Sequence, residues 1–174
     1  MNIIEAIGIG ALSSLIASIV WLFAFSLIRP NIQISDKIAK TVDRNNETVY
    51  KIKVINRGRR PIMNVQAKFA VATPRIAPNG FVIRIINIEL QTHELFALAK
   101  FDKGDEEAQY AYRFLTYENL DTAWIDDKLS YLVFRIYATD SLSGLGKLFE
   151  RKLRLKRNSL IEGDFEVGDS FEIA

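Results

Sequence analysis

The stretch WLFAFSLIRPNIQIS, Trp21 to Ser35, contains the boundary that organises this chain. Its first part is apolar apart from Ser26, and the composition turns polar at Arg29-Pro30. A segment suited to a bilayer therefore meets a segment suited to water. We place the domain boundary here, with a transmembrane helix in residues 1–30 and a β-sandwich domain in residues 31–174.

The apolar side of this boundary is long enough to cross a membrane. Ala6 to Ile28 form a run of 23 residues without a charge. At about 1.5 Å per residue the run reaches roughly 35 Å, against a hydrocarbon core of about 30 Å. A cleaved signal peptide would need a basic segment before a shorter apolar core, but only Glu5 is charged before this run. A buried core helix is the other alternative, and the charge-free length argues against it.

The charges that flank the run indicate its orientation. The N-terminal side carries no Lys or Arg, whereas Arg29, Lys37, Lys40 and Arg44 follow the run closely. The positive-inside rule then predicts an external N-terminus and a cytoplasmic domain, as in a single-pass protein of a cell inner membrane. The absence of cysteine agrees, because small exported domains often carry disulfides.

The charge of the remaining chain is balanced. All 23 Lys and Arg and 20 of the 21 acidic residues follow the helix, which leaves a net charge of about +3. A dedicated nucleic-acid binder would carry a dominant basic stripe, so we expect no nucleic acid polymer as a partner.

After Pro30 the apolar residues recur with a period of two, which is typical of half-buried strands. The clearest such segments are TVYKIKVIN (48–56), NVQAKFAV (64–71), FVIRIINIEL (81–90), YLVFRIYAT (131–139) and LFERKLRLKR (148–157). Residues typical of turns separate them, in DRNNET, NRGRRP, TPRIAPNG, DKGDEE and DSLSGLG. The pattern predicts an all-β antiparallel sandwich or barrel, with one short helical turn in TYENLDTAWIDD capped by Thr116 or Asp121.

Catalytic chemistry has few candidate residues. His93 is the one histidine, cysteine is absent, and no G-x-S-x-G turn presents a serine. One His without Cys does not make a zinc site, and the acidic GDEE segment lacks the spaced oxygen ligands of a calcium loop. We therefore expect a protein that is not an enzyme and that has no catalytic residue, metal site or cofactor.

Three features point to binding. Ala6, Gly10, Ser14 and Ser18 recur at every fourth helical position, and such small residues let membrane helices pack closely. The turn NRGRRP brings Arg57, Arg59 and Arg60 together, and Arg29, Lys37 and Lys40 lie near the same membrane end in sequence. These six basic residues are the predicted site for anionic lipid or another phosphate-bearing ligand, such as a nucleotide. The basic segment GKLFERKLRLKR is interpreted as the solvated face of a strand.

From Trp21 to its end the chain resembles the inner helix and cytoplasmic domain of inward-rectifier potassium channels. FAFSLIRPNIQISDKIAKT resembles the helix exit, and YKIKVINRGRRPIMNVQAKFAV a strand, the Asn-x-Arg turn and the next strand. INIELQTHELFALAKF resembles the approach to the central strands, and residues 131–173 the closing strands with Leu160, Ile161, Gly163 and Phe165 or Phe171 in the final motif.

The resemblance implies an immunoglobulin-like β-sandwich that assembles as a tetramer and responds to ligands at the membrane surface. It matches Arg29 to the helix-exit arginine and the arginine turn to the lipid-sensing turn. The outer helix, the pore helix and the selectivity filter are missing, so selective potassium conduction is not expected. The family's H-x-I-D-x-x-S-P segment is also absent.

The sequence thus favours a membrane-anchored sensor or regulatory protein that forms a homo-oligomer and responds to a ligand or lipid at the cytoplasmic face. The alternative is a membrane-disrupting or pore-forming effector of a bacterial antiphage defence system, triggered through its cytoplasmic domain. This alternative is an analogy of layout. An enzyme is the least favoured class.

The predicted orientation can be tested by protease protection. Because the basic residues follow the span, the domain should lie inside the cell and resist protease added to intact cells. It should be cut once the membrane is permeabilised. Digestion of the domain in intact cells would reverse the orientation.

Overall fold

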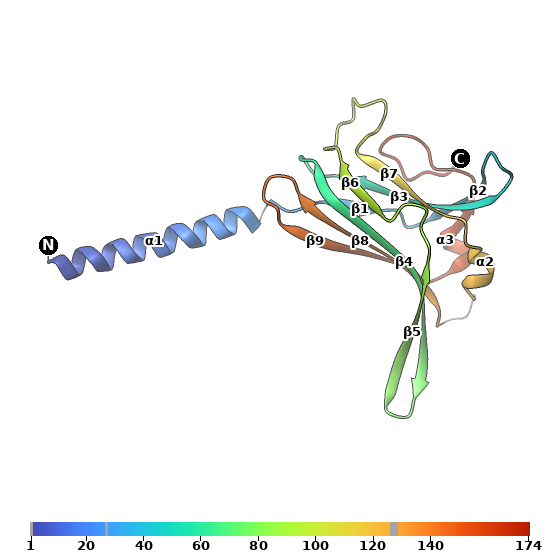
Figure 1. Cartoon of the computed structure of the whole chain (residues 1–174), viewed down its shortest axis with the longest axis horizontal. Helices are drawn as coiled ribbons and strands as arrows, with labels where there is room; N and C mark the ends of the chain where they lie inside the picture. Colours follow the sequence, from blue (N-terminus) through green and yellow to red (C-terminus); the bar gives the residue numbers. More distant parts are fainter. Residues whose placement is uncertain (1, 27, 126–128) are drawn as a thin grey trace.

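The chain folds into one long apolar helix followed by a β-rich domain (Figure 1). The computed structural model describes residues 2–26, 28–125 and 129–174, without the side chains of residues 3–6 and 26. The elements in chain order are α1 (Ile3–Ser26), β1 (Ile32–Ile34), β2 (Ile38–Val42), β3 (Thr48–Asn56), β4 (Ile62–Ala77), β5 (Gly80–Ile88), β6 (Glu94–Leu98), β7 (Ala111–Thr116), α2 (Leu120–Ala123), β8 (Tyr131–Asp140), β9 (Gly146–Leu153), α3 (Lys156–Ser159) and β10 (Leu160–Glu162).

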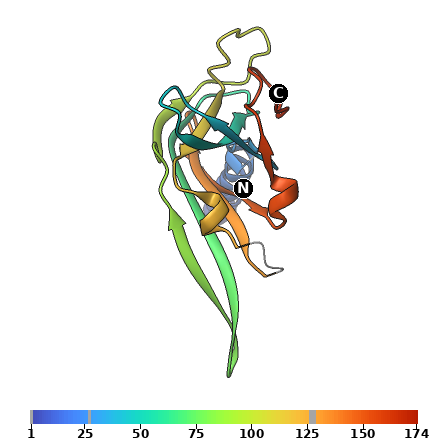
Figure 2. The same ribbon diagram turned by 90° about the vertical axis from the view of Figure 1, so that its right-hand side faces the viewer.

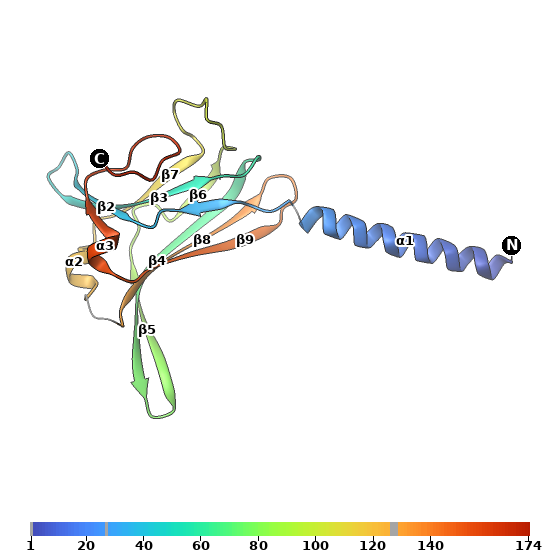
Figure 3. The ribbon, with the colours of Figure 1, turned by 180° about the vertical axis from the view of Figure 1, so that it is seen from behind.

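Helix α1 extends away from the domain, as Figures 1 and 3 show from opposite sides. Its 19-residue segment Ile7–Phe25 has a mean hydropathy of 2.1, and none of it is buried against the rest of the chain. A helix that is apolar on all sides fits a core or a membrane span, and α1 has no core around it. The prediction of a helix long and apolar enough to cross a membrane is therefore confirmed.

Strand β3 is the centre of the first sheet. It pairs antiparallel with β1 and β2 along one edge and with β7 along the other, while β10 adds parallel to β2. Strand β4 is the centre of the second sheet. Its first half pairs with β6 and its second half with β5 along one edge, and β8 followed by β9 lies along the other.

The two sheets bury a common core. The alternation in β3 places Ile52 and Val54 inside, and the alternation in β4 does the same for Phe69 and Val71. Across the core the rings of Phe114 from β7 and Phe134 from β8 lie 5.5 Å apart. Full burial of each such side chain stabilises the fold by about 1.5–3 kcal/mol, so this contact decides how the sheets pack. The prediction of an all-β domain after the helix is confirmed.

Two local predictions were wrong. Helix α2 is capped by Asn119 and not by Thr116 or Asp121, because the Asn119 Oδ1 atom accepts hydrogen bonds from the backbone N–H groups of Asp121 and Thr122. Strand β9 ends at Leu153, and Leu155 lies outside the strand with 47% of its surface exposed. The backbone turns there to begin α3.

The segment TPRIAPNG was expected to be a turn, but most of it is strand. Strand β4 continues to Ala77 and β5 begins at Gly80, so only Pro78 and Asn79 turn the chain. The result is a hairpin, residues 73–86, that reaches beyond the domain and is here called the β-arm (Figures 1 and 2). Strand β5 was expected to be half-buried, but every residue of it except Ile88 is exposed. The reason is that pairing with β8 stops at Ala72, so within the described residues no layer covers the hairpin beyond that point.

Replacement of Phe134 tests the shared core. Phe134 is fully buried, so Phe134→Ala should lower the free energy of unfolding by about 3–5 kcal/mol. The matched control is Phe96→Ala, because Phe96 is 81% exposed and its loss should change stability by less than about 0.5 kcal/mol. Thermal unfolding of the full chain in detergent, followed by circular dichroism, measures both. Equal melting of the two variants would contradict the core assignment.

Candidate functional site

A pocket lies where α1 gives way to the β-domain. The turn between β3 and β4 carries three arginines, and the segment that leaves α1 runs beside it. The two segments are joined by a hydrogen bond from the Arg57 N–H to the Asn31 carbonyl, 2.7 Å. The turn between β8 and β9 also contributes, because the Ser143 hydroxyl donates to the Ile28 carbonyl at 2.8 Å. The pocket has a volume of about 250 Å³ and is lined by Arg29, Pro30, Asn31, Asn56, Arg57, Gly58, Arg59, Arg60, Ile62 and Asp140. We call it the arginine pocket.

Asn56 gives the arginine turn its shape. This fully buried side chain donates from Nδ2 to the carbonyls of Arg60, 2.8 Å, and Ala99, 2.7 Å. Its Oδ1 atom accepts from the Gly58 N–H at 2.9 Å. A Cβ atom on residue 58 would lie only 2.9 Å from that Oδ1 atom, so glycine is needed for the close approach. The order Asn-x-Gly in the sequence thus fixes the backbone of the turn that carries the arginines.

Two of the four arginines already have partners. The Arg57 guanidinium donates to Gln33 Oε1 at 2.9 Å and to the Asp169 carbonyl at 2.7 Å, and it lies over the Phe101 ring. Arg60 pairs with the Asp140 carboxylate at 3.4 Å. The Asp140 carboxylate is held in its ionised form. Burial opposes the charge of Asp140, but hydrogen bonds from the Ser143 and Leu142 N–H groups and the charge of Arg60 outweigh it and lower the pKa of that carboxyl.

The other two arginines are uncompensated. Arg29 and Arg59 are both exposed. Within residues 2–26, 28–125 and 129–174, neither side chain makes an ion pair or a hydrogen bond. The pocket therefore presents two charges that are available to an anion. Guanidinium groups are suited to phosphate because they donate two parallel N–H bonds.

The remaining predicted basic residues lie elsewhere. Lys40 is paired with Tyr50 at the far end of β3, seven residues before Arg57 in the strand direction, which corresponds to roughly 20 Å. Lys37 does not line the arginine pocket either. The structure thus brings together Arg29, Arg57, Arg59 and Arg60 and separates them from both lysines.

The predicted helix stripe lies on α1 and faces open space. A Cβ atom at Gly10 would meet nothing within 4 Å, and the Ser18 hydroxyl donates to the Ser14 carbonyl at 2.9 Å. The side chain of Ala6 lies outside the described part of the chain. The single chain therefore leaves this face of the helix available for a partner.

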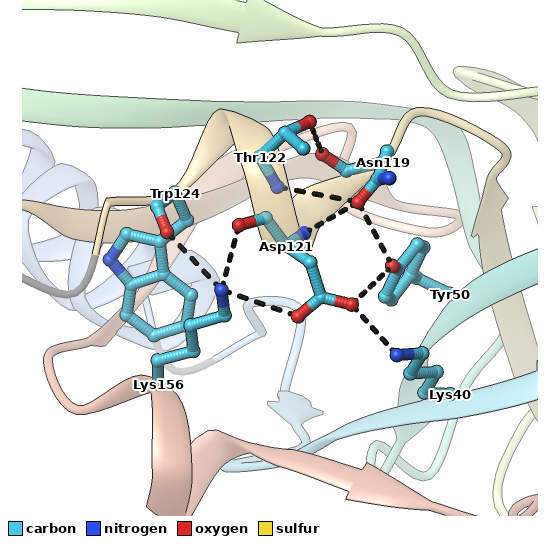
Figure 4. Close-up of polar contacts among 7 residues, drawn as sticks. All are labelled: Lys40, Tyr50, Asn119, Asp121, Thr122, Trp124 and Lys156. Carbon is cyan, nitrogen blue, oxygen red and sulfur yellow. Dashed lines mark hydrogen bonds and ion pairs between the residues drawn. The ribbon is translucent and has the colours of Figure 1, made fainter.

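Lys40 belongs to a second polar cluster that centres on Asp121 (Figure 4). The Asp121 carboxylate accepts from Lys40 at 2.7 Å and from the Tyr50 hydroxyl at 3.1 Å, and it pairs with Lys156 at 3.2 Å. The hydrogen bond from Lys40 is the largest effect on this carboxyl; burial opposes it, Lys156 and Tyr50 reinforce it, and the pKa falls to about 2. The cluster thus connects α2, β2, β3 and α3, and each of its charged groups already has a partner within it.

A third polar arrangement holds the C-terminal loop, residues 163–174, against the first sheet. The buried Lys53 ammonium donates to the carbonyls of Glu166, 2.6 Å, and Ser170, 2.7 Å. Arg113 donates to the Phe165 carbonyl at 2.6 Å. Burial, reinforced by the charge of Arg113, lowers the pKa of Lys53 to about 8. The loop is thus tied through its backbone.

The residues considered for catalysis or metal binding lie apart from the arginine pocket. His93 is exposed. Among the described residues, no group of three or more His, Asp and Glu side chains is placed to hold a metal ion. Sequence reasoning did not identify Asp140 or Asn56 as parts of the site. The turn signal DSLSG could have pointed to Asp140, since aspartate often accepts backbone N–H bonds at the start of a turn.

Comparisons with known proteins give little further information. No protein-family model and no curated protein matches the chain. Among solved structures, the chain is similar to Spo0M, a sporulation control protein from Bacillus subtilis, with 11% identity and a TM-score of 0.41. The match covers 72% of this chain and 49% of that one, so the chain corresponds to about half the length of that protein.

The Asp121 cluster predicts a specific pH dependence. The folded-state pKa of about 2 lies below the ordinary value of 3.8, so the stabilisation is complete above pH 4 and is lost as the pH falls toward 2. Asp121→Asn should therefore lower the free energy of unfolding by about 1–2 kcal/mol at pH 7, and its melting temperature should converge with that of the wild type near pH 2. Thermal unfolding at several pH values measures the difference. A gap that stays constant from pH 7 to pH 2 would contradict an ionised Asp121 as its source.

Proposed function

We propose that this chain is a single-pass, non-enzymatic membrane protein whose cytoplasmic domain binds the phosphate of anionic lipid head groups in the arginine pocket and acts as a sensor or regulator. The observation that carries the proposal is the position of the pocket. Arg29 follows α1 almost directly and lines the pocket with three further arginines. If α1 spans the bilayer, this pocket lies at the head-group level.

The charges of the pocket support a phosphate ligand. Arg29 and Arg59 have no partner within the described residues, and each basic residue near an anionic surface contributes about 1 kcal/mol of attraction. Arg60 can share its guanidinium between Asp140 and a ligand oxygen, since Asp140 occupies one side of it. Two free arginines and one shared arginine fit the several oxygens of a phosphodiester.

The size of the pocket favours a head group over a nucleotide. Its volume of about 250 Å³ is below the roughly 300–1,000 Å³ of most small-molecule sites. A phosphate with its immediate substituents fits such a space, whereas a base and sugar would extend into solvent. We therefore rank anionic lipid above a free nucleotide, both of which the sequence allowed.

The proposed fold is an immunoglobulin-like sandwich. In the first sheet β3 lies between β7 on one side and β1 and β2 on the other, with β10 beyond β2. The second sheet contains β5 and β6, then β4, β8 and β9 in that order. In immunoglobulin lettering, β1 and β2 would be strand A, β3 strand B and β7 strand E of one sheet. Strands β4, β8 and β9 would be C, F and G of the other, in the order that immunoglobulin domains have. This order supports the fold that the resemblance to inward-rectifier channels implies, and the kinship itself stays a prediction.

Self-association through α1 completes the proposal. Gly10, Ser14 and Ser18 lie on a helix with no protein around it, so a second copy can approach there. A homo-oligomer, such as a tetramer, would bring several arginine pockets side by side beneath the bilayer. Ligand binding would shift the assembly only if the lipid prefers one packing of the helices over another.

The arginine pocket can be tested by lipid binding to the full chain in neutral detergent. Replacing the two unpaired arginines, in Arg29→Gln with Arg59→Gln, should weaken binding of short-chain phosphatidylglycerol about 10-fold or more, because two charges of about 1 kcal/mol each are lost. Native mass spectrometry or lipid-induced thermal stabilisation measures the affinity. Raising the salt concentration should narrow the difference between the variant and the wild type.

The matched control removes the same charge from the β-arm, in Arg75→Gln with Arg84→Gln, and should bind the lipid as the wild type does. Phosphatidylcholine tests the need for anionic charge, and inorganic phosphate tests the phosphate alone. If lipid binding weakened equally in both double variants, the loss of affinity would come from the change in net charge, and the pocket would not be the binding site. Tighter binding of a nucleotide than of phosphatidylglycerol would overturn the preference for lipid.

A further inference from the structure

The β-arm exposes large apolar side chains that no other described part of the chain covers. Their exposed fractions are 83% for Ile76, 75% for Phe81, 58% for Val82, 51% for Ile83, 53% for Ile85 and 44% for Ile86. Taking roughly 150 Å² for each residue, the lower end of the aromatic range, these fractions leave on the order of 550 Å² of apolar surface over the two faces of each arm. This is at the upper end of what a soluble monomer exposes, roughly 300–600 Å², and approaches the roughly 800 Å² that each partner buries in a standard interface.

The pairing register places these side chains on defined faces. Phe81 pairs with Ile76, Ile83 with Pro74 and Ile85 with Ala72. Cross-strand partners lie on the same face of a sheet. One face of the arm therefore contains only apolar residues from its tip to Ala72, where it joins the cluster of Ala70, Ala72 and Val133 on the outside of the second sheet.

The free edge of the arm lacks the features that prevent strand pairing. Strand β5 pairs only with β4 among the described residues, so its outer edge is open. It contains no proline and one charged residue, Arg84. The opposite edge of the same sheet, β9, carries Lys147, Glu150, Arg151 and Lys152, and such charges are how natural proteins protect edges. Of the β5 and β9 edges, only the β5 edge is unprotected.

The tip of the β-arm lies far from the arginine pocket. Strand β4 begins at Ile62, beside the arginine pocket, and its 16 residues end at the tip of the arm. At about 3.3 Å per residue the tip lies roughly 50 Å along the strand from that pocket. Figure 1 shows the arm leaving the domain across the direction of α1. Copies anchored through α1 in one membrane would therefore carry their arms at a common height.

We propose that the β-arm is a self-association element, in which β5 pairs antiparallel with β5 of a second copy of this chain around Ile83. The proposal rests on the membrane anchoring proposed above for the common orientation of the copies. A two-fold axis along the membrane normal reverses the direction of a strand that lies across it, so two such arms meet antiparallel. The unpaired backbone N–H and C=O groups of the two β5 edges then bond to each other, and the two apolar faces become continuous.

The register follows from charge and side-chain pairing. Centring the axis on Arg84 would place two like charges directly opposite each other, which destabilises a sheet. Centring it on Ile83 places Phe81 opposite the partner's Ile85 and Arg84 opposite the partner's Val82. Aromatic side chains next to β-branched ones are favourable cross-strand pairs.

The absence of native cysteine permits a direct test in the full chain, reconstituted in lipid vesicles. Ile83→Cys should form a disulfide-linked dimer under mild oxidation, since directly opposed residues in an antiparallel pair lie about 4.5–5.5 Å apart at Cα, within disulfide range. The matched control is Leu148→Cys on the β9 edge, which is 59% exposed and should remain monomeric. Equal cross-linking at both positions, or none at Ile83→Cys, would overturn the proposal.

A second variant separates the arm from the helix and from lipid binding. Adding Phe81→Lys and Ile85→Lys to Ile83→Cys should reduce the cross-linked dimer at least 10-fold without lowering the melting temperature, because both side chains are already exposed. Phosphatidylglycerol affinity should not fall, so failure of the arm and failure of the arginine pocket give different results. Undiminished cross-linking would overturn pairing through this face. If Ile83→Cys stayed monomeric in vesicles and its cysteine did not react with a water-soluble maleimide, the arm would lie in the bilayer instead.

Discussion

The packing of Phe114 against Phe134 across the two sheets is the contact on which the rest of the domain depends. Both rings are buried, and the strands that carry them pair directly with β3 and β4 at the sheet centres. Because these central strands are fixed by the core, the turn between them is fixed as well. That turn is the arginine turn, so the position of the charged site is set by hydrophobic burial and not by the charges themselves.

The period-two pattern located the five strands β3, β4, β5, β8 and β9, but not β1, β2, β6, β7 and β10. The segment Thr48–Asn56 was identified with its observed bounds, and the apolar helix and the arginine turn were placed correctly. The pattern failed where burial depends on a partner strand. Residues 73–77 carry two turn-prone positions, Thr73 and Pro74, yet they remain in β4 because β5 pairs with them. Alternation within one strand carries no information on where a neighbouring strand ends, so the exposure of the arm could not be predicted.

The candidate site was predicted in part for a similar reason. Arg57, Arg59 and Arg60 lie in one turn, so their closeness follows from sequence. Lys40 was grouped with them because it follows the helix closely, but β2 runs along β3 away from that turn. Distance along the chain from α1 is therefore a poor measure of distance from it in space once strands begin. The ion-pair partners of Arg57 and Arg60 lie 112 and 80 residues away in the sequence, so identifying them needed the structure.

Arg57 connects the arginine pocket with the C-terminal loop, because it contributes to both. Its guanidinium lines the arginine pocket and also holds the Asp169 carbonyl of the C-terminal loop. An anion bound in the pocket would compete with the Asp169 carbonyl for the Arg57 guanidinium. Release of the loop from Arg57 would in turn raise the affinity of the pocket for an anion. By thermodynamic reciprocity, each event must change the equilibrium of the other by the same factor. The C-terminal loop, which also accepts hydrogen bonds from Lys53 and Arg113, would then respond to the occupancy of the arginine pocket without any movement of the core.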